Sequence, residues 1–386
     1  MRLRDDDDQR AFRAGLRAWL RDNVPSASVS PGGGPDAGEL RAWSKALFDA
    51  GYAGLTWPAA HGGRGLSPIY QAIYAEESTL AGAPDHVNVI GLNMVGPTIV
   101  AAGTPAQQAH YLPRILSGDT IFCQGFSEPD AGSDLAAVRT RARETVDGGY
   151  VIDGEKVWSS YAHVADACLL LARTDPQAPR HRGLTCFLLD MTAPGVQVLP
   201  LRQLSGDSDF NQIVLTGVEV PAGSVLGDVG DGWRVAMTTL AHERGTFGIT
   251  LTARLAVQLD RLVATARATG ADRDPLLRHA VAELHVTLQG LRYTGYRALS
   301  TLERTGTPGP ESSVLKLRWA DANQRLSALA LRLLGPDAAL DGPDAFWDGH
   351  WQHARLRSRA NSIEGGTSEI LRGIVAERVL GLPRSR

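Results

Sequence analysis

Two segments in the middle of the chain combine hydroxyl, glycine and aromatic residues at spacings that suit a ligand. They are QGFSEPDAGSD at 124–134 and GEKVWSS at 154–160. Both carry serine hydroxyl groups that form hydrogen bonds, at Ser127, Ser133 and Ser160. Gly132 permits close backbone approach, and Trp158 supplies a flat face for stacking. A planar polar cofactor would suit this set. Spacing alone, however, favours a capping turn beside a tryptophan of the core.

Other reactive patterns in the sequence carry less weight. His350 and His353 stand three residues apart on an expected helix, but no carboxylate or cysteine completes a metal site at a suitable spacing. We therefore expect a surface pair of histidines and no bound metal. Pro129 breaks any GxSxG pattern around Ser127, so a serine hydrolase has little support.

Composition narrows the class of protein. The 386 residues include 39 basic and 42 acidic ones, a net charge of -3 that lacks the basic surface nucleic acid requires. With 43% hydrophobic residues the chain can bury a core. No apolar run is long enough to span a membrane, and MRLRDDDDQR at the start lacks the apolar core of a secretory signal. We expect a cytoplasmic protein that binds neither nucleic acid nor membrane.

The hydrophobic pattern divides the chain into three parts. Residues 1–120 show mostly helical spacing, and long helical patterns return over 228–386. Between them, residues 121–227 contain short apolar runs broken by turn residues, with no helical pattern between the runs. Such runs favour antiparallel strands. The predicted fold class is α+β, with an N-terminal helical domain (1–120), a central β-sandwich or barrel (121–227) and a C-terminal helical bundle (228–386).

Five motifs occur in an order and spacing that is far more specific than any of them alone. They are GFSEPDAGSD (125–134), KVWSS (156–160), FNQIVLTGVEVP (210–221), HERG (242–245) and IEGGTSEILRGIVAERVLGLPR (363–384). Together they resemble the acyl-CoA dehydrogenase family, in particular its bacterial fatty-acyl and sterol-side-chain type, over nearly the whole chain. The sequence departs from the family at Phe126, where a smaller aliphatic residue is usual. It also has RDPL at 273–276 in place of an RxxFG segment.

This resemblance implies that FAD binds between the β domain and the C-terminal bundle, with its adenine end reaching a neighbouring subunit. The residues implied at the isoalloxazine ring are Phe126, Ser127, Trp158 and Ser160. Gly132 and Ser133 would sit where the pyrophosphate and the pantetheine of acyl-CoA pass. Thr367 and Glu369 would meet the ADP portion, and Arg273 would reach the pyrophosphate of the adjoining subunit.

The reaction that the resemblance implies is the dehydrogenation of acyl-CoA to trans-2-enoyl-CoA. A carboxylate removes the α-proton, the β-hydrogen leaves as hydride to flavin N5, and electrons pass to an electron-transfer flavoprotein. In many family members the base directly precedes the Gly-Thr of the C-terminal motif, but here Gly365 holds that position and Glu364 is displaced by one residue.

A second family pattern places the base on the bundle helix, just before an arginine. Glu243 is accordingly the predicted base, with Arg244 beside it at the substrate. Without the resemblance, this pair would be typical of a solvated helical pair. The base must be desolvated, because an ordinary glutamate with a pKa near 4.3 is weak at neutral pH.

Two rival functions share the expected fold. One is a related flavin oxidase or hydroxylase that uses oxygen, and the other is a non-catalytic subunit whose partner supplies the base. Because the cofactor would be shared across an interface, we expect a homo-oligomer or a heterotetramer with a homologous subunit. The sequence does not indicate the length or branching of the acyl group.

Overall fold

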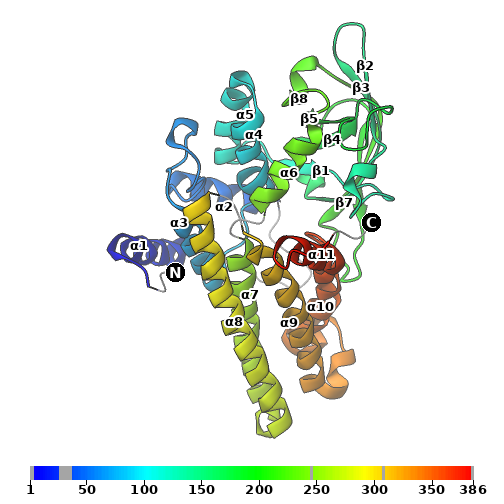
Figure 1. The fold of residues 1–386 in the computed structure, drawn as a ribbon. Coiled ribbons are helices and arrows are strands. Elements are labelled where there is room, and N and C mark those ends of the chain that lie inside the picture. Colours follow the sequence, from blue (N-terminus) through cyan, green and yellow to red (C-terminus); the bar gives the residue numbers. More distant parts are fainter. Residues whose placement is uncertain (1–3, 26–36, 244–246, 307–308, 384–386) are drawn as a thin grey trace. The chain divides into compact units, whose positions relative to one another are not determined.

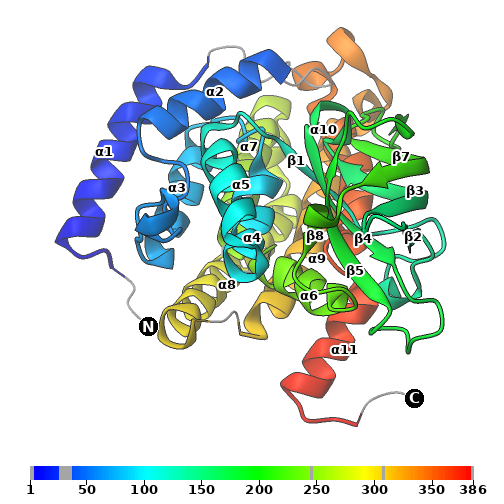
Figure 2. The ribbon, with the colours of Figure 1, turned by 90° about the horizontal axis from the view of Figure 1, so that it is seen from above.

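The computed structural model of the protein describes residues 4–25, 37–243, 247–306 and 309–383 (Figure 1 and Figure 2). The chain forms two compact units. The first, here called the helical unit, comprises residues 1–35, 67–84 and 244–386, and the second, the sheet unit, comprises residues 36–66 and 85–243. Helices precede and follow the strands along the chain, so the α+β class predicted from the sequence is confirmed.

The helical unit is built from long amphipathic helices. They are α1 (Asp7–Asn23), α3 (Pro68–Leu80), α7 (Phe247–Thr269), α8 (Pro275–Thr305), α9 (Glu311–Leu334), α10 (His350–Arg357) and α11 (Ser368–Arg378). Leucines spaced three or four residues apart on α7, α8 and α9 form the core of this unit. Trp351 of α10 is fully buried among them, and its indole N–H donates to Thr265 Oγ1 at 2.9 Å.

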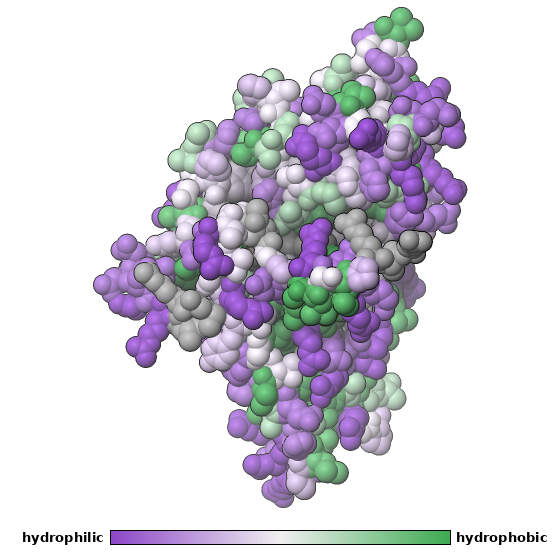
Figure 3. Space-filling view, viewed as in Figure 1, coloured by the Kyte–Doolittle hydropathy of each residue, from purple (hydrophilic) through white to green (hydrophobic). Residues whose placement is uncertain are grey.

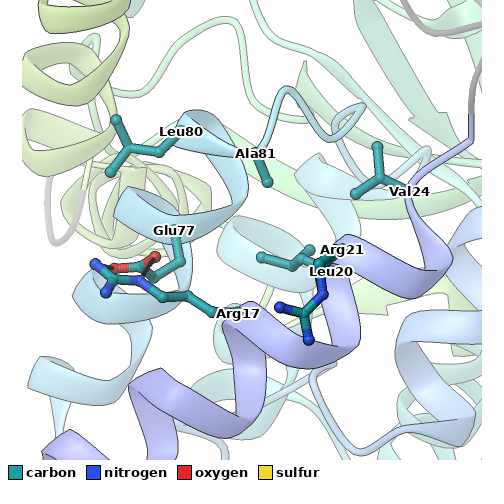
Figure 4. Close-up of a pocket in the computed structure, with 7 residues that line it drawn as sticks. All are labelled: Arg17, Leu20, Arg21, Val24, Glu77, Leu80 and Ala81. Carbon is teal, nitrogen blue, oxygen red and sulfur yellow. Dashed lines mark hydrogen bonds and ion pairs between the residues drawn. The ribbon is translucent and has the colours of Figure 1, made fainter.

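Helix α1 begins at a capping box and is joined to α3 by an ion pair. Asp6 and Gln9 form a capping box, in which each side chain accepts a hydrogen bond from the backbone N–H of the other. On the same helix, Arg17 donates to both carboxylate oxygens of Glu77 on α3, at 2.5 and 2.9 Å. The two helices line an open pocket beside this pair (Figure 4). A bidentate ion pair thus joins α1 to α3.

The sheet unit contains one eight-stranded sheet. Its strands are β1 (Phe122–Gly125), β2 (Arg141–Glu144), β3 (Tyr150–Ser160), β4 (Ala167–Arg173), β5 (Leu184–Asp190), β6 (Val196–Leu201), β7 (Phe210–Val220) and β8 (Val225–Leu226). They lie in the order β6-β7-β3-β2-β4-β5-β8, and β1 pairs with β4. Most pairs are antiparallel as predicted, but β1 and β2 run parallel to β4. The chain between these strands is long enough for the crossover that parallel pairing needs.

Strand β4 is buried on both faces. Leu169 and Leu171 face a core formed with the helices of this unit, whereas Cys168 and Leu170 face a second core formed with β3 and β7. Successive side chains of a strand point to opposite faces, so the continuous apolar run of β4 reflects two covered faces. Figure 2 shows helices α4, α5 and α6 together on one side of the sheet.

The helices of the sheet unit are α2 (Ala37–Asp49), α4 (Gly96–Ala102), α5 (Pro105–Ser117) and α6 (Gly232–Glu243). Helix α6 packs through Val235 and Ala236, both fully buried in the core that it shares with α4 and α5. The helix ends at Glu243. The packing of α6 on the sheet unit therefore sets where the backbone of the predicted base lies.

Candidate active site

Trp158 on β3 combines an exposed ring with an unusual backbone conformation. Its side chain is 61% exposed, and its φ of +61° lies in the left-handed region that a bulky residue rarely adopts. The ring makes an edge contact with Phe210, with 6.0 Å between the ring centroids. The interpretation of Trp158 as an ordinary core tryptophan is therefore wrong: the residue presents its ring to the outside at an energetic cost.

Two predicted flavin contacts lie against the strand that carries Trp158. The backbone N–H of Val157 donates to the carbonyl of Ser127 at 2.9 Å, which ties the loop after β1 to β3. Phe126, one residue earlier, is buried with 5% exposure. The structure thus brings Phe126, Ser127 and Trp158 together, and Ser160 lies two residues further along β3.

The serine hydroxyls near this strand are available to a ligand. Within the described part of the chain, no hydrogen bond occupies the hydroxyls of Ser127, Ser133 and Ser160. Ser127 and Ser160 are half-buried, and Ser133 is exposed. Gly132 is exposed as well, and a Cβ at this position would meet nothing within 4 Å. Packing within the protein therefore gives no reason for a glycine at 132, and the space beside it is open.

A buried ion pair lies behind these residues, and the sequence reasoning missed it. Lys156 Nζ donates to Glu128 Oε1 at 2.8 Å, with Lys156 fully buried and Glu128 8% exposed. Burial opposes the charge of Glu128, but the Lys156 ammonium and hydrogen bonds from Thr140 and Arg139 outweigh it and lower the pKa of Glu128. Lys156 shares the inward-facing alternation of β3 with Tyr150 and Ile152, so a charged residue stands at a buried position, a signal that the pattern of β3 already contained.

The two predicted catalytic residues stand at the end of α6. Glu243 is the last residue of that helix, whereas Arg244 lies outside the described residues. The structure therefore fixes the backbone position of the predicted base within the sheet unit. The roles of Glu243 and Arg244 stay predictions.

The carboxylate of the alternative base, Glu364, accepts hydrogen bonds from neighbouring side chains within the helical unit. Its Oε2 accepts from Arg357 at 2.8 Å, and its Oε1 accepts from Asn361 at 2.8 Å. Asn361 in turn accepts from Asn323 of α9. Both carboxylate oxygens are thus part of a network that holds the C-terminal motif against α9.

The glycines of the C-terminal motif form a tight turn before α11. Gly365 and Gly366 have φ values of +60° and +95°, which favour glycine. Lys316 of α9, itself 6% exposed, donates to the carbonyl of Gly366 at 2.8 Å. Thr367 then caps α11 by accepting from the N–H of Ile370 at 3.2 Å. The turn therefore fixes the start of α11, where backbone N–H groups favour an anion.

The structure separates the residues predicted to meet the distal half of the cofactor. Thr367 and Glu369 both lie at the start of α11, where Glu369 is exposed and pairs with Arg372. Arg273 is exposed in the turn between α7 and α8. Figure 1 shows this turn at one end of the long helices, far from α11. Within one chain, Arg273 and Thr367 therefore do not belong to one site.

The histidine pair at 350 and 353 is part of the packing of the helical unit. Contrary to the expected surface pair, His350 is partly buried: its ring contacts Trp351, with 4.9 Å between centroids, and Nε2 lies 2.9 Å from Gln258 Oε1. Burial, followed by nearby Arg261 and His353, lowers the pKa of His350 to about 4. Among the described residues, no group of three or more His, Cys, Asp or Glu side chains is placed to hold a metal ion. No helix in the same ranges has the length and apolarity to cross a membrane.

Comparison with known proteins covers almost the entire chain. Three family models match: the acyl-CoA dehydrogenase N-terminal domain at residues 6–119, the middle domain at 123–218 and the C-terminal domain at 230–380. Acyl-CoA dehydrogenase IpdE1 of Mycobacterium tuberculosis is 43% identical, with 98% of each chain covered. Acyl-CoA dehydrogenase FadE34 of the same organism is 40% identical over 88% of this chain and 46% of its own length.

Solved structures show the same fold. The steroid ACAD Tcur3481-Tcur3483 matches with a TM-score of 0.89 and 31% identity, over 100% of both chains. The ChsE4-ChsE5 complex from Mycobacterium tuberculosis matches with a TM-score of 0.87 and 29% identity, also over 100% of both chains. Five motifs, three family models and full-length relatives therefore agree: this chain belongs to the acyl-CoA dehydrogenase family of oxidoreductases.

Proposed function

We propose that this chain catalyses the FAD-dependent α,β-dehydrogenation of an acyl-CoA to a trans-2-enoyl-CoA. The observation that carries the proposal is the exposed ring of Trp158 on a strained backbone, with the unoccupied hydroxyls of Ser127 and Ser160 on the same part of the sheet unit. Backbone strain of this kind persists where a site requires it. A planar ligand that stacks on the ring and accepts hydrogen bonds from the hydroxyls accounts for all three residues.

The described residues fit FAD. Trp158 provides apolar surface for the ring system, whereas Phe126, at 5% exposure, offers the ring little of its side chain. Ser127 and Ser160 provide polar contacts, and the open space at Gly132 and Ser133 suits the pyrophosphate and the pantetheine. When bound, FAD supplies the acceptor for the hydride that leaves the β-carbon. The positively polarised start of α11, with Thr367 and Glu369, would hold the ADP portion. Arg273 would serve the cofactor of an adjoining subunit.

Glu243 would remove the α-proton of the thioester. The structure supports this choice over Glu364, because both oxygens of Glu364 already accept hydrogen bonds from Arg357 and Asn361. Removing a proton next to a carbonyl also requires donors that stabilise negative charge on the carbonyl oxygen, and it requires water to be excluded around the base. Arg244 would orient the carboxylate and the substrate beside it.

Two features support a partner subunit: the distance between Arg273 and Thr367 within one chain, and the exposed apolar side chains at α11. The proposal includes an oligomer, homomeric or formed with a homologous subunit, in which Arg273 of one chain completes the site of another. Exposed apolar side chains lie just before α11, on it and just beyond it, and Figure 3 shows a hydrophobic patch at this helix. They are Ile363, Ile370, Val379, Leu380 and Leu382. Electrons would pass to an electron-transfer flavoprotein.

The decisive experiment is an assay of the purified protein, alone and with a co-expressed homologous subunit. Straight, branched and steroid-derived acyl-CoA esters are offered, the last because one structural relative is described as a steroid ACAD. We expect bound FAD and turnover with an electron-accepting dye. Turnover with oxygen alone would favour the oxidase or hydroxylase. Binding of acyl-CoA without flavin reduction across the whole panel would favour a non-catalytic subunit.

A further inference from the structure

A lysine and a glutamate form a buried pair beneath the face that carries Trp158. Lys156 is fully buried on β3 and Glu128 is 8% exposed in the loop after β1, with 2.8 Å between Nζ and Oε1. A Cβ on Gly125 would come within 2.9 Å of Cys168 Sγ and 3.0 Å of Leu170 Cδ1, but would lie in ordinary contact, at 3.5 Å, with Lys156 Cγ. A glycine at 125 therefore leaves room for side chains of β4, and the lysine stem passes beside it.

The pair connects three pieces of backbone. Lys156 Nζ also donates to the carbonyl of Phe126 at 3.0 Å. The carboxylate of Glu128 accepts from the backbone N–H groups of Arg139 at 2.6 Å and Thr140 at 2.8 Å, just before β2. Strand β3, the loop after β1 and the entry to β2 are thus joined through two side chains.

This junction coincides with an irregularity in β3. Lys156 pairs with Ile213 and Ser159 pairs with Asn211, so three steps along β3 match two steps along β7. The extra residue forms a bulge, because the N–H of Val157 donates to Ser127 in the loop. The next residue, Trp158, takes up the positive φ and turns its ring outward.

The attraction between the two charges does not by itself explain a charged pair at this position. Replacing a buried ion pair by apolar residues of similar volume is often neutral or stabilising. Apolar residues would, however, leave the Phe126 carbonyl and the N–H groups of Arg139 and Thr140 without their present partners. Buried backbone groups need such partners. The pair supplies them and thereby fixes the path of the loop after β1.

We propose that Lys156 and Glu128 are positioning residues: they hold the loop at Phe126 and Ser127 against β3 and thereby keep the bulge that presents Trp158 to the cofactor. This inference rests on the proposed flavin function for its role in catalysis. The effect on Trp158 itself is a property of the protein without ligand. The two parts are therefore measured separately.

The test compares the full chain with Lys156→Met, with Glu128→Gln and with the double variant. The double variant removes both charges and leaves no buried charge unpaired, so it decides the matter if a single variant fails to fold. The exposure of Trp158 is measured by quenching tryptophan fluorescence with acrylamide. Each protein is compared with its own Trp158→Phe version, and the difference in quenched fluorescence is the signal of Trp158. We expect the double variant to lose most of this signal and to bind FAD at least about tenfold more weakly. Its flavin absorption band should also change shape.

Glu77→Gln is the matched control. Glu77 is a buried carboxylate, 3% exposed, that accepts from Arg13 and Arg17 in the helical unit. Its replacement should lower the melting temperature but leave Trp158 quenching and FAD affinity unchanged. A folded double variant with unchanged Trp158 quenching and unchanged FAD affinity would overturn the positioning role. A wild-type chain that never takes up FAD would instead overturn the proposed flavin function, while the quenching experiment would still decide whether the pair positions Trp158.

Discussion

The hydroxyl of Thr98 on α4 lies 3.0 Å from the hydroxyl of Thr239 on α6, and both residues are fully buried. Each hydroxyl carries one proton and also reaches the carbonyl four residues earlier, Met94 from Thr98 at 2.7 Å and Val235 from Thr239 at 3.0 Å. When Thr239 donates to Val235, its oxygen accepts from Thr98, whose proton is shared with Met94. Thr239 stands one helical turn before Glu243. The contact therefore fixes the end of α6, where the backbone of the predicted base lies.

Removing either hydroxyl should weaken the contact between α4 and α6 and lower the stability of the protein. Thr98→Val and Thr239→Val keep the shape of the side chain, and we expect each to lower the free energy of unfolding by about 1 kcal/mol. Denaturant unfolding of both variants and of the double variant gives the coupling energy, which should be roughly 0.5 kcal/mol or more. Strict additivity of the two changes would show that the hydroxyls do not interact.

The identity of the base can be settled by a pair of isosteric changes. Glu243→Gln preserves shape but removes the basic carboxylate, so acyl-CoA should still bind while flavin reduction in a single turnover slows by about 10² or more. Glu364→Gln should act mainly on stability, because Glu364 holds Arg357 and Asn361. Stopped-flow absorbance measures the reductive step, and the reverse order of effects would assign the base to Glu364.

Loss of the Trp158 ring should weaken cofactor binding more than it weakens the fold. The side chain is 61% exposed, so Trp158→Ala removes little buried surface and should shift the melting temperature only slightly. Titration with FAD should show weaker binding, and Trp158→Phe should restore part of the affinity through its smaller ring. Equal FAD affinity in all three proteins would exclude stacking on this residue.

The lowered pKa of Glu128 predicts a specific acid sensitivity. Its ordinary value is 4.5 and its value in the folded protein is lower, because the Lys156 ammonium and two backbone N–H groups outweigh burial. Ionised Glu128 therefore stabilises the fold above pH 4.5, and this contribution is lost as the pH falls below 4.5. Glu128→Gln should melt at a lower temperature than the wild type at pH 7, and the gap should narrow as the pH is lowered below 4.5. The exposed Glu303→Gln serves as the comparison and should show no such convergence.

The sequence predicted the elements whose patterns are local. The short apolar runs predicted over 121–227 include LTCFLLD at 184–190, which forms β5, and the helical spacing predicted over 1–120 includes Leu16 and Leu20, which lie on the buried face of α1. Parallel pairing of β1 with β4 could not be read from the sequence, since it joins residues some 45 positions apart along the chain, such as Phe122 and Ala167. Hydrophobicity also predicts a buried Trp158, whereas the residue is exposed. Its exposure follows from a bulge that depends on contacts between β3 and a loop distant in the sequence.

The two-sided burial of β4 has a consequence for the dynamics of the sheet unit. The strand lies between β2 and β5 with β1 also paired to it, and its side chains from Ala167 to Ala172 are all buried. Few partial openings can free its amide protons without disrupting both cores at once. Its amides should therefore be among the last to exchange with deuterated solvent, and their exchange should follow the cooperative unfolding of the entire unit.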